Sequence, residues 1–405
     1  MIKMVLNKVK IFLILVLLSV FASEIFCMKS VNICELRGHV GYVRCLAWNL
    51  NDANILATGS DDKTVRIWNV KSGNCINVLK SHTSWIECLA WNPNDANILA
   101  TGSYDGTVRI WNVTSDNCIK VLGDHTDRIS CLAWNSNDAN ILATGSSDKT
   151  VRIWNVESGN CINVLKGHTG WVNCLAWNPN DENILATESY DGTVRIWNVK
   201  SGNCINVLGD HTYWVNCLAW NPNDENILAT GSDDKIVRIW NVKRGICIKV
   251  LKGHTGWVKC LAWNLNDANI LATGSSDRTI GIWNVKSGNC IKVLGGHTDW
   301  VKCLAWNPND ANILATGSYD GTVRIWNVTS DNCIKVLEGN TGWVKCLAWN
   351  SNDANILATG SYNGTVRIWK FIYPFVKREN SNGEVSFSDI KILCENFEKL
   401  GISDN

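Results

Sequence analysis

Seven histidines recur at a fixed step of 43 residues, and each is followed by a threonine, an aspartate and a tryptophan. In the first copy these partners are Thr58, Asp62 and Trp68. The histidines are His39, His82, His125, His168, His211, His254 and His297. Histidine and aspartate bind metals and transfer protons, so a metal or catalytic site is the first chemistry to consider. Each histidine lies in a different copy of a repeat, however, so no two are expected to converge on one metal ion.

The 43-residue step is shared by two rows of tryptophans. In segments that read CLAWN the tryptophans are Trp48, Trp91, Trp134, Trp177, Trp220, Trp263, Trp306 and Trp349. In segments that read RIW or GIW they are Trp68, Trp111, Trp154, Trp197, Trp240, Trp283, Trp326 and Trp369. Eight copies account for most of the 405 residues. The length alone suggests two or three domains, but the repeat predicts one cyclic or solenoid array.

Each copy contains four runs with the character of β-strands, which in the first copy cover residues 43–48, 55–60, 64–70 and 75–79. The first run alternates in hydrophobicity, and the third is rich in β-branched residues. Turn residues separate the runs, and none shows helical periodicity. A four-stranded sheet of this size cannot bury both of its faces alone. We therefore expect the sheets to stack radially as the blades of a β-propeller.

The repeated Gly-His pair, the aspartate at a hairpin turn and the strand that ends in tryptophan resemble the WD-repeat family. The resemblance covers residues 29–373 and implies an all-β fold, a closed eight-bladed β-propeller of four-stranded antiparallel blades. The segment 30–36 precedes the first Gly-His, and we expect it to complete the last blade and close the ring. The alternative is seven blades with one extra repeat. One departure is general: asparagine follows the motif tryptophan where the family has aspartate, and Lys370 takes that place in the last copy.

The resemblance also implies a structural role for the repeated polar residues. In the family, the aspartate accepts a hydrogen bond from the histidine, the histidine meets the threonine hydroxyl, and the threonine meets the indole N–H. We therefore expect neither a catalytic nor a metal site in these rows, and no cofactor. The eighth copy has Asn340 for histidine and Asn363 for aspartate. The closing blade is thus predicted to be the least well tied and to open first.

The copies are nearly identical, so the positions at which they differ stand out. The rim positions, three residues after the histidine, are Tyr42, Trp85, Arg128, Trp171, Trp214, Trp257, Trp300 and Trp343. The channel positions, five residues after it, are Arg44, Glu87, Ser130, Asn173, Asn216, Lys259, Lys302 and Lys345. The turn positions, just before the turn aspartate, are Asp61, Tyr104, Ser147, Tyr190, Asp233, Ser276, Tyr319 and Tyr362.

In the family these positions surround the channel mouth on the top face, where partners dock. The candidate partner-binding residues are therefore the eight rim residues, the five charged channel residues and the four tyrosines at turn positions. Large exposed aromatic side chains are favoured at binding surfaces. Arg44, Lys259, Lys302 and Lys345 fall on consecutive blades of a closed ring, and Glu87 follows them. This basic arc favours an acidic or phosphorylated ligand. The alternative is that the aromatic row packs against neighbouring loops.

The charge balance of 38 Lys+Arg against 37 Asp+Glu gives no broad basic surface for nucleic acid. Nucleotide-binding, metalloprotease and nucleophile-elbow motifs are absent from the sequence. The sequence thus predicts a non-enzymatic, monomeric scaffold that binds a protein or peptide. The alternative is an extracytoplasmic propeller that binds a carbohydrate or small ligand on the same tryptophan ring.

The two ends of the chain lie outside the repeat. Residues 1–22 combine three lysines with an apolar stretch and a small-residue cleavage site, which predicts a signal peptide and an extracytoplasmic location. The alternatives are an uncleaved anchor in the membrane and, because the 18 cysteines show no disulfide or zinc spacing, a reducing cytoplasmic location. Residues 374–405 read as a linker and a short amphipathic helix.

Overall fold

The strands of this computed structural model lie within residues 29–330 and 332–372, the part of the chain that the structure describes. In this part there are 32 strands and no helix, and therefore no helix that is long and apolar enough to cross a membrane. Residues 30–371 form one compact unit. The predicted leader and the predicted C-terminal helix lie outside the described residues.

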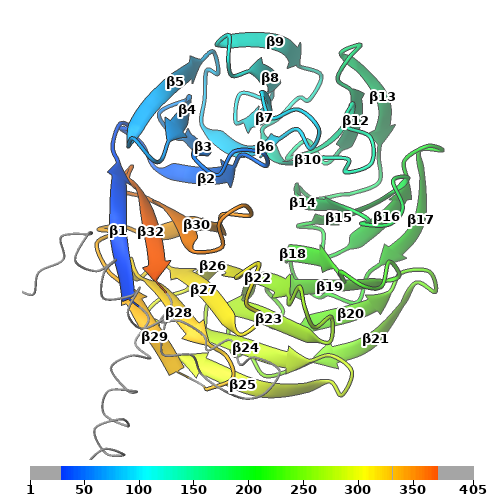
Figure 1. Cartoon of the computed structure of the whole chain (residues 1–405). Coiled ribbons are helices and arrows are strands. Elements are labelled where there is room, and N and C mark those ends of the chain that lie inside the picture. The colour runs from blue at the N-terminus through cyan, green and yellow to red at the C-terminus, as the bar shows by residue number, and fades with distance from the viewer. Residues whose placement is uncertain (1–28, 331, 373–405) are drawn as a thin grey trace, which may run out of the picture. The chain divides into compact units, whose positions relative to one another are not determined.

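Each blade has four strands, and the three inner strands follow one another directly along the chain (Figure 1). The innermost strands are β2 (Val43–Trp48), β6 (Ile86–Trp91), β10 (Ile129–Trp134), β14 (Val172–Trp177), β18 (Val215–Trp220), β22 (Val258–Trp263), β26 (Val301–Trp306) and β30 (Val344–Trp349). The second strands are β3 (Ile55–Ser60), β7 (Ile98–Ser103), β11 (Ile141–Ser146), β15 (Ile184–Ser189), β19 (Ile227–Ser232), β23 (Ile270–Ser275), β27 (Ile313–Ser318) and β31 (Ile356–Ser361). The third strands are β4 (Thr64–Asn69), β8 (Val108–Asn112), β12 (Val151–Asn155), β16 (Val194–Asn198), β20 (Val237–Asn241), β24 (Thr279–Asn284), β28 (Val323–Asn327) and β32 (Val366–Ile372).

The outer strands decide how the ring closes. They are β5 (Asn74–Lys80), β9 (Asn117–Leu122), β13 (Asn160–Leu165), β17 (Asn203–Leu208), β21 (Ile246–Leu251), β25 (Asn289–Gly295), β29 (Asn332–Leu337) and β1 (Lys29–Leu36). Blades 1–7 take four consecutive strands each, beginning with β2, whereas blade 8 has the order β1-β32-β31-β30. The predicted eight blades and the predicted closing strand are confirmed, and the seven-bladed alternative is wrong.

A β-bulge recurs at the start of every innermost strand. In blade 1 the register passes from Val43 opposite Ser60 to Cys45 opposite Gly59, which leaves Arg44 without a partner across the strand pair. The same shift occurs in the other seven blades. Because a bulge kinks its strand and re-aims a side chain, the channel position is set apart in each blade by backbone geometry.

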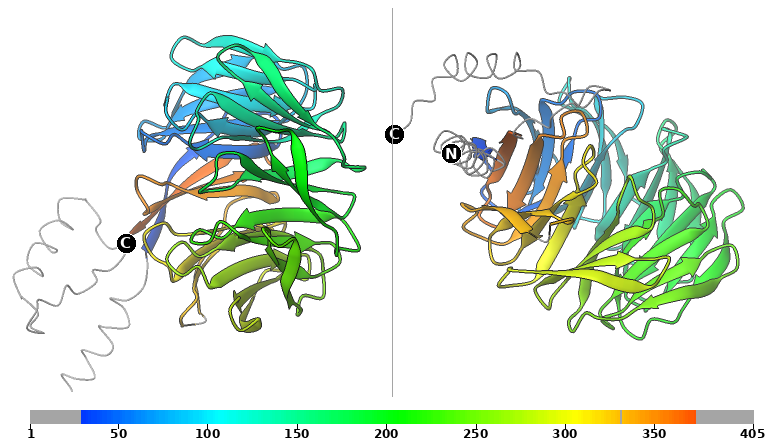
Figure 2. Two further views of the ribbon diagram at one scale, coloured as in Figure 1. Left: turned by 90° about the vertical axis from the view of Figure 1, so that its right-hand side faces the viewer. Right: turned by 60° about the horizontal axis from the view of Figure 1, so that its bottom comes forward.

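The hydrophobic core lies between blades rather than within them. Ala57, Ile67 and Leu79 of blade 1 pack with Ile86 and Trp91 of blade 2, and every one of these side chains is almost fully buried. The closing interface is built in the same way, with Leu36 of β1 packed in one cluster with residues of blades 8 and 1. The side views in Figure 2 show the twisted blades lying face against face. Each sheet thus covers one face of its neighbour, as a sheet of this size requires.

Two sets of hydrogen bonds at the bottom of the ring, where the innermost strands end, join each blade to a neighbour. The indole N–H of the CLAWN tryptophan donates to an alanine carbonyl of the preceding blade at 3.0–3.1 Å, as Trp48 does to Ala348. The amide of the following asparagine donates to a carbonyl of the next blade at 2.7–2.8 Å. The bond from Asn350 to Ala53 completes the ring.

The predicted histidine network is present in blades 1–7. Histidine Nδ1 lies 2.7–2.9 Å from the turn aspartate, and Nε2 lies 2.8–2.9 Å from the threonine Oγ1. The motif tryptophan donates to the same Oγ1 at 2.8 Å. A carboxylate only accepts, so Nδ1 carries the proton and Nε2 accepts from the threonine. Every buried polar atom of the network is then satisfied, and the rows are structural.

Blade 8 lacks this network, as its sequence predicts. Both polar side-chain atoms of Asn340 are buried without a hydrogen-bond partner in the structure. Asn363 donates to Thr341 instead, and the bond from Trp369 to Thr359 is 3.1 Å long. The prediction that this blade opens first remains to be measured.

The cysteines in the described part of the chain are all free thiols. Burial raises the pKa of the thiols in the innermost row, as at Cys88, Cys174 and Cys260. The sequence predicts that this row is buried, whereas its thiols are only partly buried and pack against the edges of the core clusters.

Candidate functional site

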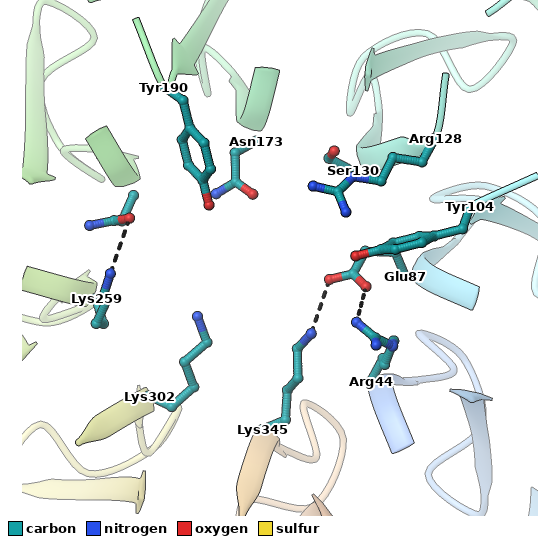
Figure 3. Close-up of a pocket in the computed structure, with 11 residues that line it drawn as sticks. Arg44, Glu87, Tyr104, Arg128, Ser130, Asn173, Tyr190, Lys259, Lys302 and Lys345 are labelled. Carbon is teal, nitrogen blue, oxygen red and sulfur yellow. Dashed lines mark hydrogen bonds and ion pairs between the residues drawn. The ribbon is translucent and has the colours of Figure 1, made fainter. Parts of the chain in front are cut away.

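The channel positions of all eight blades line one cavity of about 190 Å³ at the top of the ring, the end at which the innermost strands begin. Arg128 from a rim position and two tyrosines from turn positions, Tyr104 and Tyr190, complete the lining. Figure 3 shows these side chains pointing inward from different blades. The structure thus brings together residues that lie up to about 300 positions apart in the chain.

Rim and turn positions of the same blade are neighbours for a backbone reason. The N–H of each turn residue donates to the carbonyl of the rim residue at 2.9–3.0 Å, as Tyr104 does to Trp85. This bond recurs in all eight blades. Two side chains therefore lie side by side at the top of each blade. Because the backbone is the same in every blade, the chemical character of the surface there depends on which residues occupy these two positions.

The rim displays aromatic side chains. Tyr42, Trp85, Trp171, Trp214, Trp257 and Trp343 are 41–50% exposed. Trp300 is less exposed than these six and is of intermediate burial. The alternative, in which the row packs against neighbouring loops, does not describe these six positions, because each retains close to half of its surface in solvent. Aromatic groups of this size at a cavity mouth are a typical anchor surface for a partner.

The aromatic side chains are ordered by stacking on one another. On blades 7, 8 and 1 they form a continuous row in which neighbouring ring centroids lie 4.3–5.7 Å apart. The row consists of Trp300, Tyr319, Trp343, Tyr362 and Tyr42. A shorter row on blades 4 and 5 joins Trp171, Tyr190 and Trp214. Such contacts restrict the orientations of the rings.

Three of the cations lie against aromatic side chains of the rim and turn positions. The Arg44 guanidinium lies 4.5 Å from the ring centroid of Trp85, and Arg128 lies 4.7 Å from Tyr104 and 4.4 Å from Trp171. The Lys259 ammonium lies 4.6 Å from the centroid of Trp257. These cation–π contacts hold the positive groups between the aromatic rim and the cavity.

Three of the four cations in the predicted basic arc are ion-paired. Arg44 pairs with Asp61 and, at 2.7 Å, with Glu87. Lys345 also pairs with Glu87, at 3.0 Å. Glu87 was expected to end the arc, but the converging geometry places its carboxylate between cations of blades 8 and 1. Lys259 pairs with Asp233 at 2.8 Å.

Lys302 differs from these three cations. Its ammonium makes no hydrogen bond or ion pair with any described residue, and it points toward the centre of the cavity (Figure 3). Burial lowers its pKa, and the nearby Lys345 and Lys259 lower it further. For Lys345, burial also lowers the pKa, but Glu87 outweighs it and the pKa is raised. The two lysines therefore have opposite electrostatic environments on adjacent blades.

Glu188 is a residue at this site that the sequence reasoning missed. It takes the place of a glycine that the other seven copies share, and it is fully buried. A Cβ at any of those glycines would lie 2.6–2.8 Å from a cysteine Sγ, so the position is tightly packed. Asn173 donates to Glu188 Oε1 at 3.1 Å, and Oε2 has no partner in the structure. Burial raises the pKa of Glu188 well above its usual range and so favours the neutral, protonated form of its carboxyl.

The signal for Glu188 was in the sequence, since residues 185–189 read LATES where the other copies read LATGS. Asp61 and Asp233 also stood out at the variable turn positions, but only the structure shows that they neutralise Arg44 and Lys259. Within the described ranges, 29–330 and 332–372, no group of three His, Cys, Asp or Glu residues is arranged to hold a metal ion.

The repeat and the eight-bladed ring have counterparts among known proteins. Residues 28–168 match the family described as WDR19 first beta-propeller. Five further segments match the family described as WD domain, G-beta repeat, at residues 159–198, 202–241, 245–284, 288–327 and 331–370. The chain belongs to the WD-repeat family.

Similarity of this WD-repeat chain to individual relatives is confined to about one repeat. It is 50% identical over 44 residues to human apoptotic protease-activating factor 1, which is 11% of this chain and 3% of that protein. It is 49% identical over 45 residues to the pre-mRNA-splicing factor PRP46 of Candida glabrata, 11% and 10% of the two chains. THO complex subunit 3 of Arabidopsis thaliana is 44% identical over 41 residues, 10% and 13%. The matches thus span no more than 13% of these relatives.

A solved structure resembles this chain over most of its length. The crystal structure of the computationally designed Ika8 protein aligns with a TM-score of 0.74 and 27% identity, covering 84% of this chain and 99% of that one. The likeness concerns the arrangement of the blades.

Proposed function

We propose that this protein is a non-enzymatic interaction scaffold that binds a peptide or protein segment on the top face. The observation that carries the proposal is the ring of six exposed aromatic side chains around a charged cavity. WD-repeat propellers are typically scaffolds, and two of the relatives are named as a splicing factor and as a subunit of a complex. Aromatic anchors around a polar centre are the anatomy of protein recognition sites.

The cavity gives the bound segment its chemical character. Positive side chains from Arg44, Arg128, Lys259, Lys302 and Lys345 line it, against one lining carboxylate, that of Glu87. The partner is therefore a segment that carries acidic or phosphorylated groups, with apolar side chains between the rim tryptophans. The charge would also speed its approach over a distance of about one Debye length, ~8 Å at physiological salt.

Peptide arrays of acidic, phosphorylated and neutral sequences test this proposal when probed with the full chain and with the double variant Trp257→Ala/Trp343→Ala. We expect the wild type to bind acidic or phosphorylated sequences and the variant to lose most of that binding. The matched control is Ile119→Ala/Ile162→Ala, which removes two exposed side chains from outer strands far from the rim. Equal binding by the wild type and the rim variant would contradict the proposal.

Carbohydrate binding is the second candidate, because exposed tryptophan rings also serve as stacking platforms for sugars. Trp214 stacks on Tyr190 with ring centroids 4.6 Å apart and is still 50% exposed, so its indole is a candidate platform of that kind. A glycan array probed with the same three proteins decides between the two. Tryptophan-dependent binding to glycans, with none to peptides, would replace the first proposal with this one.

A further inference from the structure

The central cavity contains more positive charge than its own carboxylates balance. Five cations line it, and the three carboxylates in contact with them are those of Glu87, Asp61 and Asp233. The buried Glu188 behind the wall makes no ion pair with these cations, and burial favours its neutral form. Two of the five cations are therefore in excess, and they are the two that the described residues leave without an ion pair, Lys302 and Arg128.

These two cations are directed inward, and Arg128 is also held in place by its neighbours. Arg128 Nε donates to Ser147 Oγ at 2.8 Å, and its guanidinium lies between the rings of Tyr104 and Trp171. The terminal nitrogens remain directed into the cavity, and the Lys302 ammonium faces the same space from blade 7 (Figure 3). A charge confined in this way without a counter-ion is costly, and an entering anion would relieve that cost.

Neutral donors complete the lining. The Tyr190 hydroxyl points toward the same space (Figure 3), and Ser130 adds a second hydroxyl to the wall. Burial is the main cause that raises the pKa of Tyr190 to about 12, so its hydroxyl is protonated and can donate a hydrogen bond. Donors thus approach from several blades at once. A tetrahedral oxyanion presents oxygens in several directions, whereas a planar carboxylate presents only two.

The size of the cavity agrees with such a ligand. A volume of about 190 Å³ exceeds several times the ~30 Å³ that one water molecule occupies in the liquid. It accommodates a phosphate group with a few bridging waters, and it is too small for a folded partner element, such as a helix of ~10–12 Å diameter. The aromatic rim lies outside this space and remains free to contact whatever the phosphate is attached to.

We propose that the top of the channel is a phosphate-binding site in which Lys302 and Arg128 grip the anion from different blades. The anion is either free inorganic phosphate or the phosphate of a phosphorylated side chain. The inference deepens the proposed function of the same face, and it rests on that function only for the second source. The other three cations contribute to the positive electrostatic potential around the site, but their nitrogens are already paired with carboxylates. They are Arg44, Lys259 and Lys345.

Isothermal titration calorimetry with the full chain at low salt tests the site. The probes are inorganic phosphate, a phosphoserine peptide chosen from the arrays, and the same peptide without phosphate. We expect wild-type binding of phosphate, a loss of about tenfold or more in Lys302→Met, and substantial retention in Lys302→Arg. Lys71→Met, which removes an exposed lysine from an outer turn, is the matched control and should bind as the wild type does.

Two further checks show that any loss of binding is not caused by misfolding. Lys302→Met removes an unpaired charge from the cavity, so it should fold, and its thermal midpoint verifies this. Arg128→Gln provides an independent second variant from another blade. Unchanged phosphate affinity in folded Lys302→Met, or no phosphate binding by the wild type, would overturn the inference.

The three probes distinguish failure of the phosphate site from failure of the proposed scaffold function. If the unphosphorylated peptide binds and neither phosphate nor the phosphate group of the peptide adds affinity, the scaffold proposal stands and the phosphate site fails. If inorganic phosphate binds in a manner that depends on Lys302 but no peptide does, the phosphate site stands and the peptide scaffold fails. Trp343→Ala should weaken peptide binding while leaving inorganic phosphate unaffected.

Discussion

The bottom and the top of the ring are formed by the same eight innermost strands and differ in how uniform they are. At the bottom every strand ends in tryptophan and is followed by asparagine, and both side chains bond a neighbouring blade in all eight copies. At the top the channel positions carry five residue types, and their partners differ from blade to blade. The bottom and the histidine network thus stabilise the ring in a uniform way, whereas the top contains groups that lower stability, such as the unpaired Lys302, and the proposed function would account for their presence.

The largest effect is expected when the core of the uniform network is removed. In blade 3, Thr144→Val leaves Trp154 and His125 without their shared hydroxyl, and we expect a loss of about 3 kcal/mol. Thr359→Val in blade 8 leaves only Trp369 without its hydrogen-bond acceptor, because Asn340 makes no hydrogen bond that could be lost. It should cost about half as much. Equal shifts of the urea midpoint in the two variants would show that the networks are not what distinguishes blade 8.

A second test compares the two ends of the innermost strand of blade 3. Asn135→Ala at the bottom of blade 3 removes the bond to Glu182 and two bonds that hold its own turn. We expect a loss of about 2 kcal/mol in the free energy of unfolding. Ser130→Ala at the top of the same strand should change it by less than about 0.5 kcal/mol. If urea denaturation showed a larger loss of stability for Ser130→Ala than for Asn135→Ala, the proposed difference between the top and the bottom of the ring would be wrong.

Blade 8 offers a test by repair. The double substitution Asn340→His/Asn363→Asp rebuilds the residue set of the other blades, and it should raise the free energy of unfolding by about 1 kcal/mol. Hydrogen exchange should be fastest in blade 8 of the wild type and should slow there in the variant. Unchanged exchange in that blade would mean that another feature limits its stability.

The smallest effect is expected at Glu188. Glu188→Gly restores the residue of the other copies and should stabilise the protein by less than about 1 kcal/mol at pH 5. Because burial raises the pKa of Glu188 in the folded state, the wild type loses stability as the pH rises from the unfolded value of about 4.3 through that raised pKa. The advantage of the variant should therefore grow between pH 5 and pH 8. An advantage that is constant across this range in thermal melts would contradict the assignment.

Much of the fold followed from the sequence because the repeat multiplies a weak signal eight times. Strand 55–60 was predicted to the residue, and segment 30–36 was predicted to close the ring. The hydrogen-bond network was implied by the family resemblance carried by His39 and its partners. These features depend on residues within one copy or on the ends of the array, and both are visible in a single chain.

The pairing inside the channel could not be predicted in this way. Glu87 and Lys345 are 258 residues apart, and they meet only because eight bulged strands converge on one axis. The sequence shows which positions vary, but the partner of each variable side chain depends on the reach and angle of the others. The cross-blade bonds of Trp48 and Asn49 were missed for a similar reason, since their acceptors are backbone carbonyls that carry no sequence signal.

The identical joints at the bottom of the ring have a consequence for assembly. Each blade offers its neighbour the same two donors and the same carbonyls, so a blade from one molecule fits beside a blade of another as well as beside its own. Only the join made by β1 has a sequence of its own. Exchange of blades between chains, and closure with the wrong copy, are therefore the errors that folding of this protein has to avoid, and the initial strand is the element that marks the correct end.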